Sequence, residues 1–232
     1  KRPVIVACAR TPIGRAHKDK GWFRNVRSDD LATSVVKAVV ERSGIDPKEI
    51  DDLVLGCAFP EKEQGLNVGR AVSLMAGLPF TVSGATVNRW CGSSLQALNQ
   101  AAHSIIAEAE DVQVVGGLEH MQHIPMDTIG EINPKLFTRT SRAALMMGIT
   151  AEFLAQSQNI SRADQDAFAL AAITATPASG ETSKNGSVRA TSKAAVIIVE
   201  PESMRTSPNS AIAENQVPNS LMTCPAHSRR KF

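Results

Sequence analysis

The chain has 232 residues, of which 43% are hydrophobic and 21% are charged, with a formal net charge of +2. These values are ordinary for a globular protein, and so small a charge argues against nucleic acid or a membrane surface as a partner. The longest apolar runs fall well short of the roughly 20 residues that cross a bilayer, so we expect no membrane span.

Strand and helix patterns alternate through the first half of the chain. Short apolar runs predict strands, and apolar residues at helical spacing predict the helices between them. The strands are expected at 4–9, 53–58, 85–87 and 112–117, and the helices at 28–43, 67–76 and 93–109. Ser28 is the expected N-cap of the first helix. This alternation predicts an α/β layered fold, with a mainly parallel mixed sheet and helices on both faces, over residues 1–117.

Residues 118–170 form a looser segment that we interpret as a loop and substrate-binding region. His120 and His123 stand near each other, but no third ligand has a metal-site spacing, so a structural role is favoured. Ser161 is expected to cap a helix, with Asp164 three positions later completing a capping box.

Residues 171–232 change in character. No aromatic residue occurs between Phe168 and Phe232, and only 194–199 forms an apolar run. Such a composition predicts a disordered or irregular tail. We interpret it as foreign to the preceding fold, and an out-of-frame origin is one explanation.

Cys91 stands where the third predicted strand meets the following helix. The positive end of a helix dipole favours a thiolate, which is the nucleophilic form. The small residues 92–94 leave room for a substrate. The alternative is a buried packing cysteine. The other cysteines are Cys8, Cys57 and Cys224. None of the four forms a CxxC pair or a metal-type cluster, which indicates a reducing, intracellular compartment and no metal site.

Several motifs together resemble the thiolase family, whose members make or cleave 3-ketoacyl-CoA. The similarity extends over about 4–168 and is strongest in Asn-Arg-Trp-Cys-Gly-Ser-Ser-Leu-Gln-Ala at 88–97. The other matching segments are 9–15, 63–70, 114–121, 147–152 and 161–168. The Glu-His-Met turn at 119–121 is most similar to the degradative, fatty-acid-oxidation type.

The resemblance implies that Cys91 carries an acyl group as a thioester and that coenzyme A is a co-substrate, with no bound cofactor. It implies that Met147 and Gly148 border the acyl or pantetheine arm. A homodimer or homotetramer, and a place as a subunit of a multifunctional β-oxidation complex, are the implied assemblies. The compartment would be the cytoplasm in a bacterium, or a mitochondrion or peroxisome in a eukaryote.

The family also uses a Gly-His-Pro histidine, a second cysteine and an Asn-Glu-Ala-Phe segment, and these 232 residues contain no counterpart of them. Little turnover is therefore expected from this chain alone. Two alternatives remain open. The chain is a non-catalytic fragment or interaction subunit of this fold, or it belongs to another condensing enzyme of the same superfold.

Overall fold

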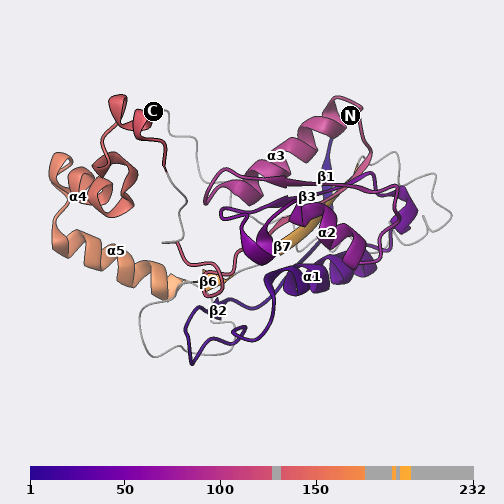
Figure 1. Ribbon diagram of the computed structural model, residues 1–232, viewed down its shortest axis with the longest axis horizontal. Helices are drawn as coiled ribbons and strands as arrows, with labels where there is room; N and C mark the ends of the chain where they lie inside the picture. Colours follow the sequence, from indigo (N-terminus) through magenta and orange to yellow (C-terminus); the bar gives the residue numbers. More distant parts are fainter. Residues whose placement is uncertain (127–131, 176–189, 192–193, 200–232) are drawn as a thin grey trace. The chain divides into compact units, whose positions relative to one another are not determined.

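The computed structural model describes residues 1–126, 132–175, 190–191 and 194–199 (Figure 1). The chain divides into two compact units. The first comprises Lys1–Met126 and Val188–Phe232, and the second comprises Asp127–Ser187.

A five-stranded sheet forms the centre of the first unit, in the order β1-β7-β5-β3-β4. The strands are β1 (Val4–Arg10), β3 (Asp52–Gly56), β4 (Ser83–Val87), β5 (Val112–Gly117) and β7 (Ala194–Val199). β3 pairs in parallel with both β4 and β5, whereas β7 runs antiparallel to β5 and β1. A short pair, β2 (Gly14–Arg15) and β6 (Ala190–Thr191), forms a second sheet. The predicted α/β fold with a mainly parallel mixed sheet is confirmed.

Helices cover both faces of this sheet. α1 (Ser28–Ser43) and α2 (Val68–Met75) lie on one face, and α3 (Ser93–Ile106) lies on the other (Figure 1). The period of two along β3 explains the layering, since Leu53 and Leu55 join the core under α1 and α2. Val54, between them, packs in the separate core under α3.

The start of α1 differs from its prediction. Ser28 is already helical and Arg27 occupies the N-cap position, so Ser28 as N-cap is wrong. The amide of Ser28 instead donates to Glu63 Oε1 at 2.7 Å. Glu63 belongs to the 3₁₀ turn η2 (Lys62–Gln64), and a similar turn, η1 (Pro47–Glu49), precedes β3. A side chain 35 positions away has taken the capping role that local sequence assigned to Ser28.

The described part of the second unit, residues 132–175, is helical. It contains the turns η3 (Pro134–Thr138) and η4 (Ala143–Leu145) and the helices α4 (Met147–Ser157) and α5 (Arg162–Ala175). The capping box before α5 is confirmed, because Ser161 Oγ accepts the Asp164 amide at 3.1 Å and Asp164 Oδ2 accepts the Ser161 amide at 3.2 Å. Across the described part of the chain, every helix is too short or too polar to cross a membrane.

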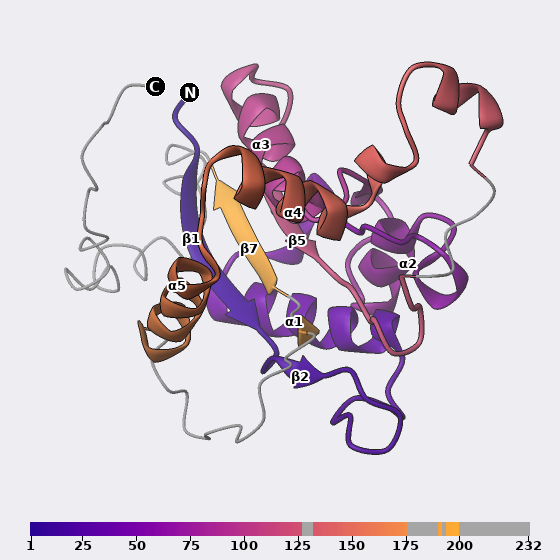
Figure 2. The ribbon, with the colours of Figure 1, turned by 90° about the vertical axis from the view of Figure 1, so that its left-hand side faces the viewer.

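The segment 171–232 is not wholly foreign to the fold. α5 continues to Ala175, beyond the expected boundary at 170. The apolar run at 194–199 forms β7, which lies between β1 and β5 in the main sheet, and Figure 2 shows it beside β1. The expectation of an irregular tail elsewhere in 171–232, and Cys224 within it, falls outside the described residues.

Candidate active site

Cys91 lies in the tight connection between β4 and α3, and its side chain is exposed. The alternative of a buried packing cysteine is therefore wrong for this position. Cys57, at the end of β3, is the buried thiol instead. Gly92 is the N-cap of α3, so Cys91 directly precedes the positive end of that helix.

The turn that carries Cys91 has an unusual backbone. Trp90 has a φ of 49°, in the left-handed region that costs a residue with a Cβ roughly 1–2 kcal/mol. Ser93 closes the turn, since its buried Oγ accepts the Arg89 amide at 2.8 Å and donates to the Trp90 carbonyl at 2.5 Å. The Trp90 ring also packs edge-on against Phe59, with 5.6 Å between ring centroids.

Two glycines allow the first turn of α3 to approach the sheet closely. A Cβ on Gly56 would lie 2.3 Å from backbone atoms of Ser93 and Ser94. A Cβ on Gly117 would lie 1.8 Å from Ser94 Oγ. Both glycines end their strands, so the turn bearing Cys91 sits directly over the carboxyl ends of β3 and β5. In parallel sheets this is the edge where ligands bind.

Glu119 and Gln64 connect the loops beside this turn. Glu119 Oε2 accepts the Ala58 amide at 2.8 Å, and its Oε1 accepts the Gln64 side-chain amide at 2.7 Å. Gln64 Oε1 in turn accepts the His120 amide at 2.7 Å. Sequence reasoning used these residues as marks of resemblance but assigned them no role. Their function depends on contacts between residues more than 50 positions apart.

His120 and His123 stack on each other, with 3.9 Å between ring centroids. His120 Nε2 lies 3.0 Å from the Phe23 carbonyl oxygen. His123 lies 2.8 Å from the Arg24 carbonyl oxygen and 2.9 Å from Glu63 Oε1. These contacts give the pair the structural role that the sequence favoured. Within the described ranges, no group of three or more metal-ligating side chains comes together.

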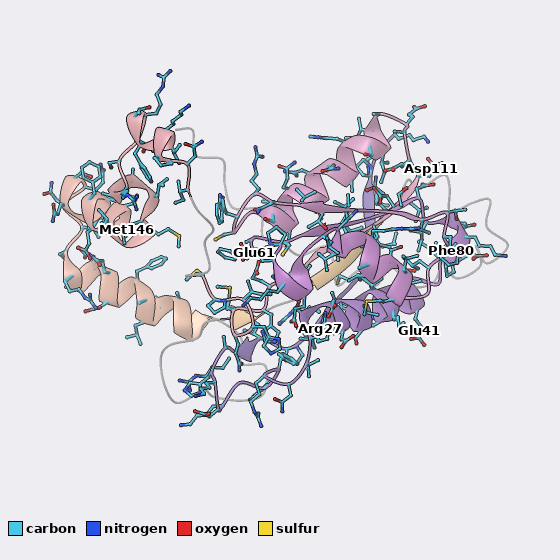
Figure 3. The ribbon with its side chains drawn as sticks, viewed as in Figure 1. Arg27, Glu41, Glu61, Phe80, Asp111 and Met146 are labelled. Atoms are coloured by element: carbon cyan, nitrogen blue, oxygen red, sulfur yellow. The ribbon has the colours of Figure 1, made fainter. Side chains whose placement is uncertain are left out.

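Glu63 carries the charge in this cluster. Partial burial raises the pKa of Glu63, but its hydrogen bonds from the His123 ring and the Ser28 amide lower it. Arg27, labelled in Figure 3, adds a favourable positive charge 3.9 Å away. The net result is a Glu63 pKa below its usual value.

The two other candidate site residues lie in the second unit. Met147 is the first residue of α4 and is 68% exposed. A Cβ added to Gly148 would meet no atom within 4 Å, so packing in the described structure does not require a glycine there. Their role beside the Cys91 acyl group remains a prediction.

None of the described residues forms a hydrogen bond with the Cys91 sulfur. A nucleophilic cysteine ordinarily has a base within hydrogen-bond reach, although such contacts are often looser without substrate. This part of the chain thus presents a thiol at a fixed position, and none of the residues that the structure describes is hydrogen-bonded to it as a base.

The fold and site define an α/β layered domain that presents an exposed cysteine at a strand-to-helix turn. A family model described as thiolase, N-terminal domain, matches residues 3–187. The chain belongs to the thiolase family and contains its N-terminal domain.

Curated relatives agree with this assignment. The 3-ketoacyl-CoA thiolase of Shewanella frigidimarina is 46% identical over 171 residues, which cover 73% of this chain and 44% of the relative. The 3-ketoacyl-CoA thiolase of Pseudoalteromonas translucida is 47% identical over 168 residues, covering 72% and 43% respectively. The chain therefore matches somewhat less than half the length of these relatives.

Proposed function

We propose that this chain supplies the nucleophile of a thiolase, in which Cys91 carries an acyl group as a thioester during cleavage of 3-ketoacyl-CoA. The observation that carries the proposal is the exposed thiol of Cys91 on a constrained turn at the ligand-binding edge of the sheet. The names of the relatives support thiolysis over the chemistry of other condensing enzymes.

The proposed reaction has two steps. The Cys91 thiolate attacks the 3-keto carbon, and the bond between carbons 2 and 3 breaks, so that the enolate of acetyl-CoA leaves and takes a proton at carbon 2. The thiol of a second coenzyme A then attacks the Cys91 thioester and releases its proton, which balances the proton taken up in the first step. The shortened acyl-CoA departs and the cysteine thiolate is regenerated, which is covalent catalysis of the ping-pong type.

The remaining site and partner assignments extend the same proposal. Met147 and Gly148 border the acyl or pantetheine arm, and coenzyme A acts as co-substrate without a bound cofactor. A homodimer or homotetramer, with or without a larger β-oxidation assembly, is the proposed state. Cys8, Cys57 and Cys91 are free thiols, which supports a reducing compartment such as the bacterial cytoplasm.

The 232 residues do not include the Gly-His-Pro histidine or the second catalytic cysteine that the family resemblance implies. Loss of a general base commonly costs about 10²–10⁴-fold in rate. We therefore expect this chain to accept an acyl group slowly and to turn over very little in a thiolysis assay with acetoacetyl-CoA.

Acyl transfer to Cys91 is the direct test. The chain is incubated with acetyl-CoA, and peptide mass spectrometry follows S-acetylation at each cysteine over time. We expect acetylation at Cys91, its loss in Cys91→Ala, and its retention in Cys8→Ser, which removes the other thiol that is exposed among the described residues. Acetylation of Cys8 as fast as Cys91, or thiolysis at the rate of a full-length relative, would contradict the proposal.

A non-catalytic subunit of this fold is the second candidate, favoured by the lack of a hydrogen-bonded base at the described Cys91 site. Iodoacetamide separates the two, since a retained nucleophile reacts faster than an ordinary surface thiol. Alkylation of Cys91 no faster than that of Cys8 favours the non-catalytic subunit.

A further inference from the structure

The left-handed conformation of Trp90 requires an explanation, because it directly precedes Cys91. The one residue of the turn 88–92 that lacks a Cβ is Gly92, and it does not occupy the left-handed region. A strained backbone of this kind persists only where surrounding contacts over-determine it. The contacts that hold Trp90 therefore also fix the position of Cys91.

Asn88 makes two such contacts with its side-chain amide. Its Oδ1 accepts the Trp90 amide at 2.9 Å, and its Nδ2 donates to the Ala58 carbonyl at 3.1 Å. The first bond closes a local turn on the residue with positive φ, and the second ties that turn to the loop after β3. Only a side chain with one acceptor and one donor satisfies both partners at once.

The Ala58 peptide is itself held from the other side. Glu119 accepts the Ala58 amide, while the Ala58 carbonyl receives the hydrogen bond from Asn88. Cys57 adds a further tie, since its amide donates to the Val87 carbonyl at 3.0 Å. A continuous set of hydrogen bonds thus runs from Glu119 through Ala58 and Asn88 to the amide of Trp90.

We infer that Asn88 is a positioning residue for Cys91, and that Glu119 supports it through the Ala58 peptide. Asn88 acts on the backbone of the turn. Among the described residues, its side chain forms hydrogen bonds with Trp90 and Ala58 and none with the Cys91 sulfur. The inference deepens the proposed function and rests on it, because the position of Cys91 matters for catalysis only where Cys91 accepts the acyl group.

Three substitutions separate the contributions. Asn88→Ala removes both hydrogen bonds. Asn88→Asp keeps an acceptor for the Trp90 amide, but it replaces the donor to the Ala58 carbonyl with a carboxylate oxygen. Glu119 accepts from the Ala58 amide and from the Gln64 side chain. Glu119→Gln turns an NH₂ group toward one of these two donors, so that one of the two hydrogen bonds is lost. Asn99→Ala, on the exposed surface of α3, is the matched control.

The measurement is the rate of modification at Cys91 relative to Cys8, by acetyl-CoA in one series and by iodoacetamide in another. Loss of two hydrogen bonds worth about 1 kcal/mol each predicts a roughly 30-fold lower ratio in Asn88→Ala. We expect Asn88→Asp, which loses one of the two bonds, to lower the ratio about fivefold. Glu119→Gln acts only through the Ala58 peptide and should lower it about two- to threefold, and Asn99→Ala should leave it unchanged.

The outcomes separate the two proposals. If wild-type Cys91 is not acetylated, the proposed function fails, and the iodoacetamide series still decides whether Asn88 positions the thiol. An unchanged Cys91 to Cys8 ratio in Asn88→Ala overturns the positioning role. An equal loss in Asn88→Ala and Asn88→Asp overturns the part assigned to the Trp90 amide. Should Asn88→Ala not fold, Asn88→Asp and Glu119→Gln still test the tie through Ala58, and an unchanged Cys91 to Cys8 ratio in both variants overturns the inference.

Discussion

Gly56 determines how closely the helix behind Cys91 can approach the sheet. Backbone atoms of Ser93 and Ser94 occupy the space that a Cβ at position 56 would need. Backbone atoms cannot move aside as a flexible side chain can. Gly56→Ala is therefore expected to destabilise the protein by about 1–3 kcal/mol, the usual range for overpacking. It should also slow modification of Cys91, since relief of the clash displaces the first turn of α3. Urea unfolding and iodoacetamide kinetics measure the two effects.

Gly148→Ala is the control for this substitution. An added Cβ at Gly148 meets nothing within 4 Å, and alanine is the better helix former inside α4. Its free energy of unfolding should not fall. Equal stability for Gly56→Ala and the wild type would show that α3 does not pack on β3 as closely as the structure indicates.

At the scale of secondary-structure elements, Glu63 connects three separate segments. It accepts the amide at the start of α1, lies in η2, and contacts His123 after β5. The pKa of Glu63 is lowered in the folded state, so the unfolded chain binds the proton more readily. Its contribution to stability is fully present above the ordinary glutamate pKa of about 4.3 and is lost as the pH falls through the folded value.

Glu63→Gln should remove this pH dependence. We expect it to be less stable than the wild type by roughly 1.5–3 kcal/mol at pH 6, the range for hydrogen bonds to a charged group, with the difference shrinking below pH 4. Urea unfolding between pH 3 and pH 7 measures the difference at each pH. Glu41→Gln, an exposed position labelled in Figure 3, should show no such trend. A constant difference between wild type and Glu63→Gln across this range would contradict the assigned role.

The elements of the first half could be predicted because their signals are local. Leu53, Val54 and Leu55 alternate between two cores, and the strand-to-helix junction at Cys91 follows from neighbouring residues. The insertion of β7 between β1 and β5 could not be predicted, because a short apolar run does not specify which strands it pairs with. The roles of Asn88 and Glu119 were also missed, because each depends on a partner distant in sequence.

At the scale of the whole chain, the two units differ in how much apolar surface they bury. The first unit has cores on both faces of the sheet, with Leu53 and Val54 almost fully buried. In α4 no residue is buried, and its Phe153 is 65% exposed. In α5, Phe168 is 77% exposed. Most helical stability in proteins comes from tertiary packing, so α4 and α5 are expected to be far less stable than the sheet.

Hydrogen exchange followed by mass spectrometry should resolve this difference. Peptides from β3 and β5 should be protected for about as long as global unfolding takes, whereas those from α4 and α5 should exchange by local opening. Paired substitutions should agree: Leu53→Ala should cost about 2–5 kcal/mol and Phe153→Ala less than about 0.5 kcal/mol. Protection of α4 equal to that of β3 in the 232-residue chain would show that α4 already has its packing partner.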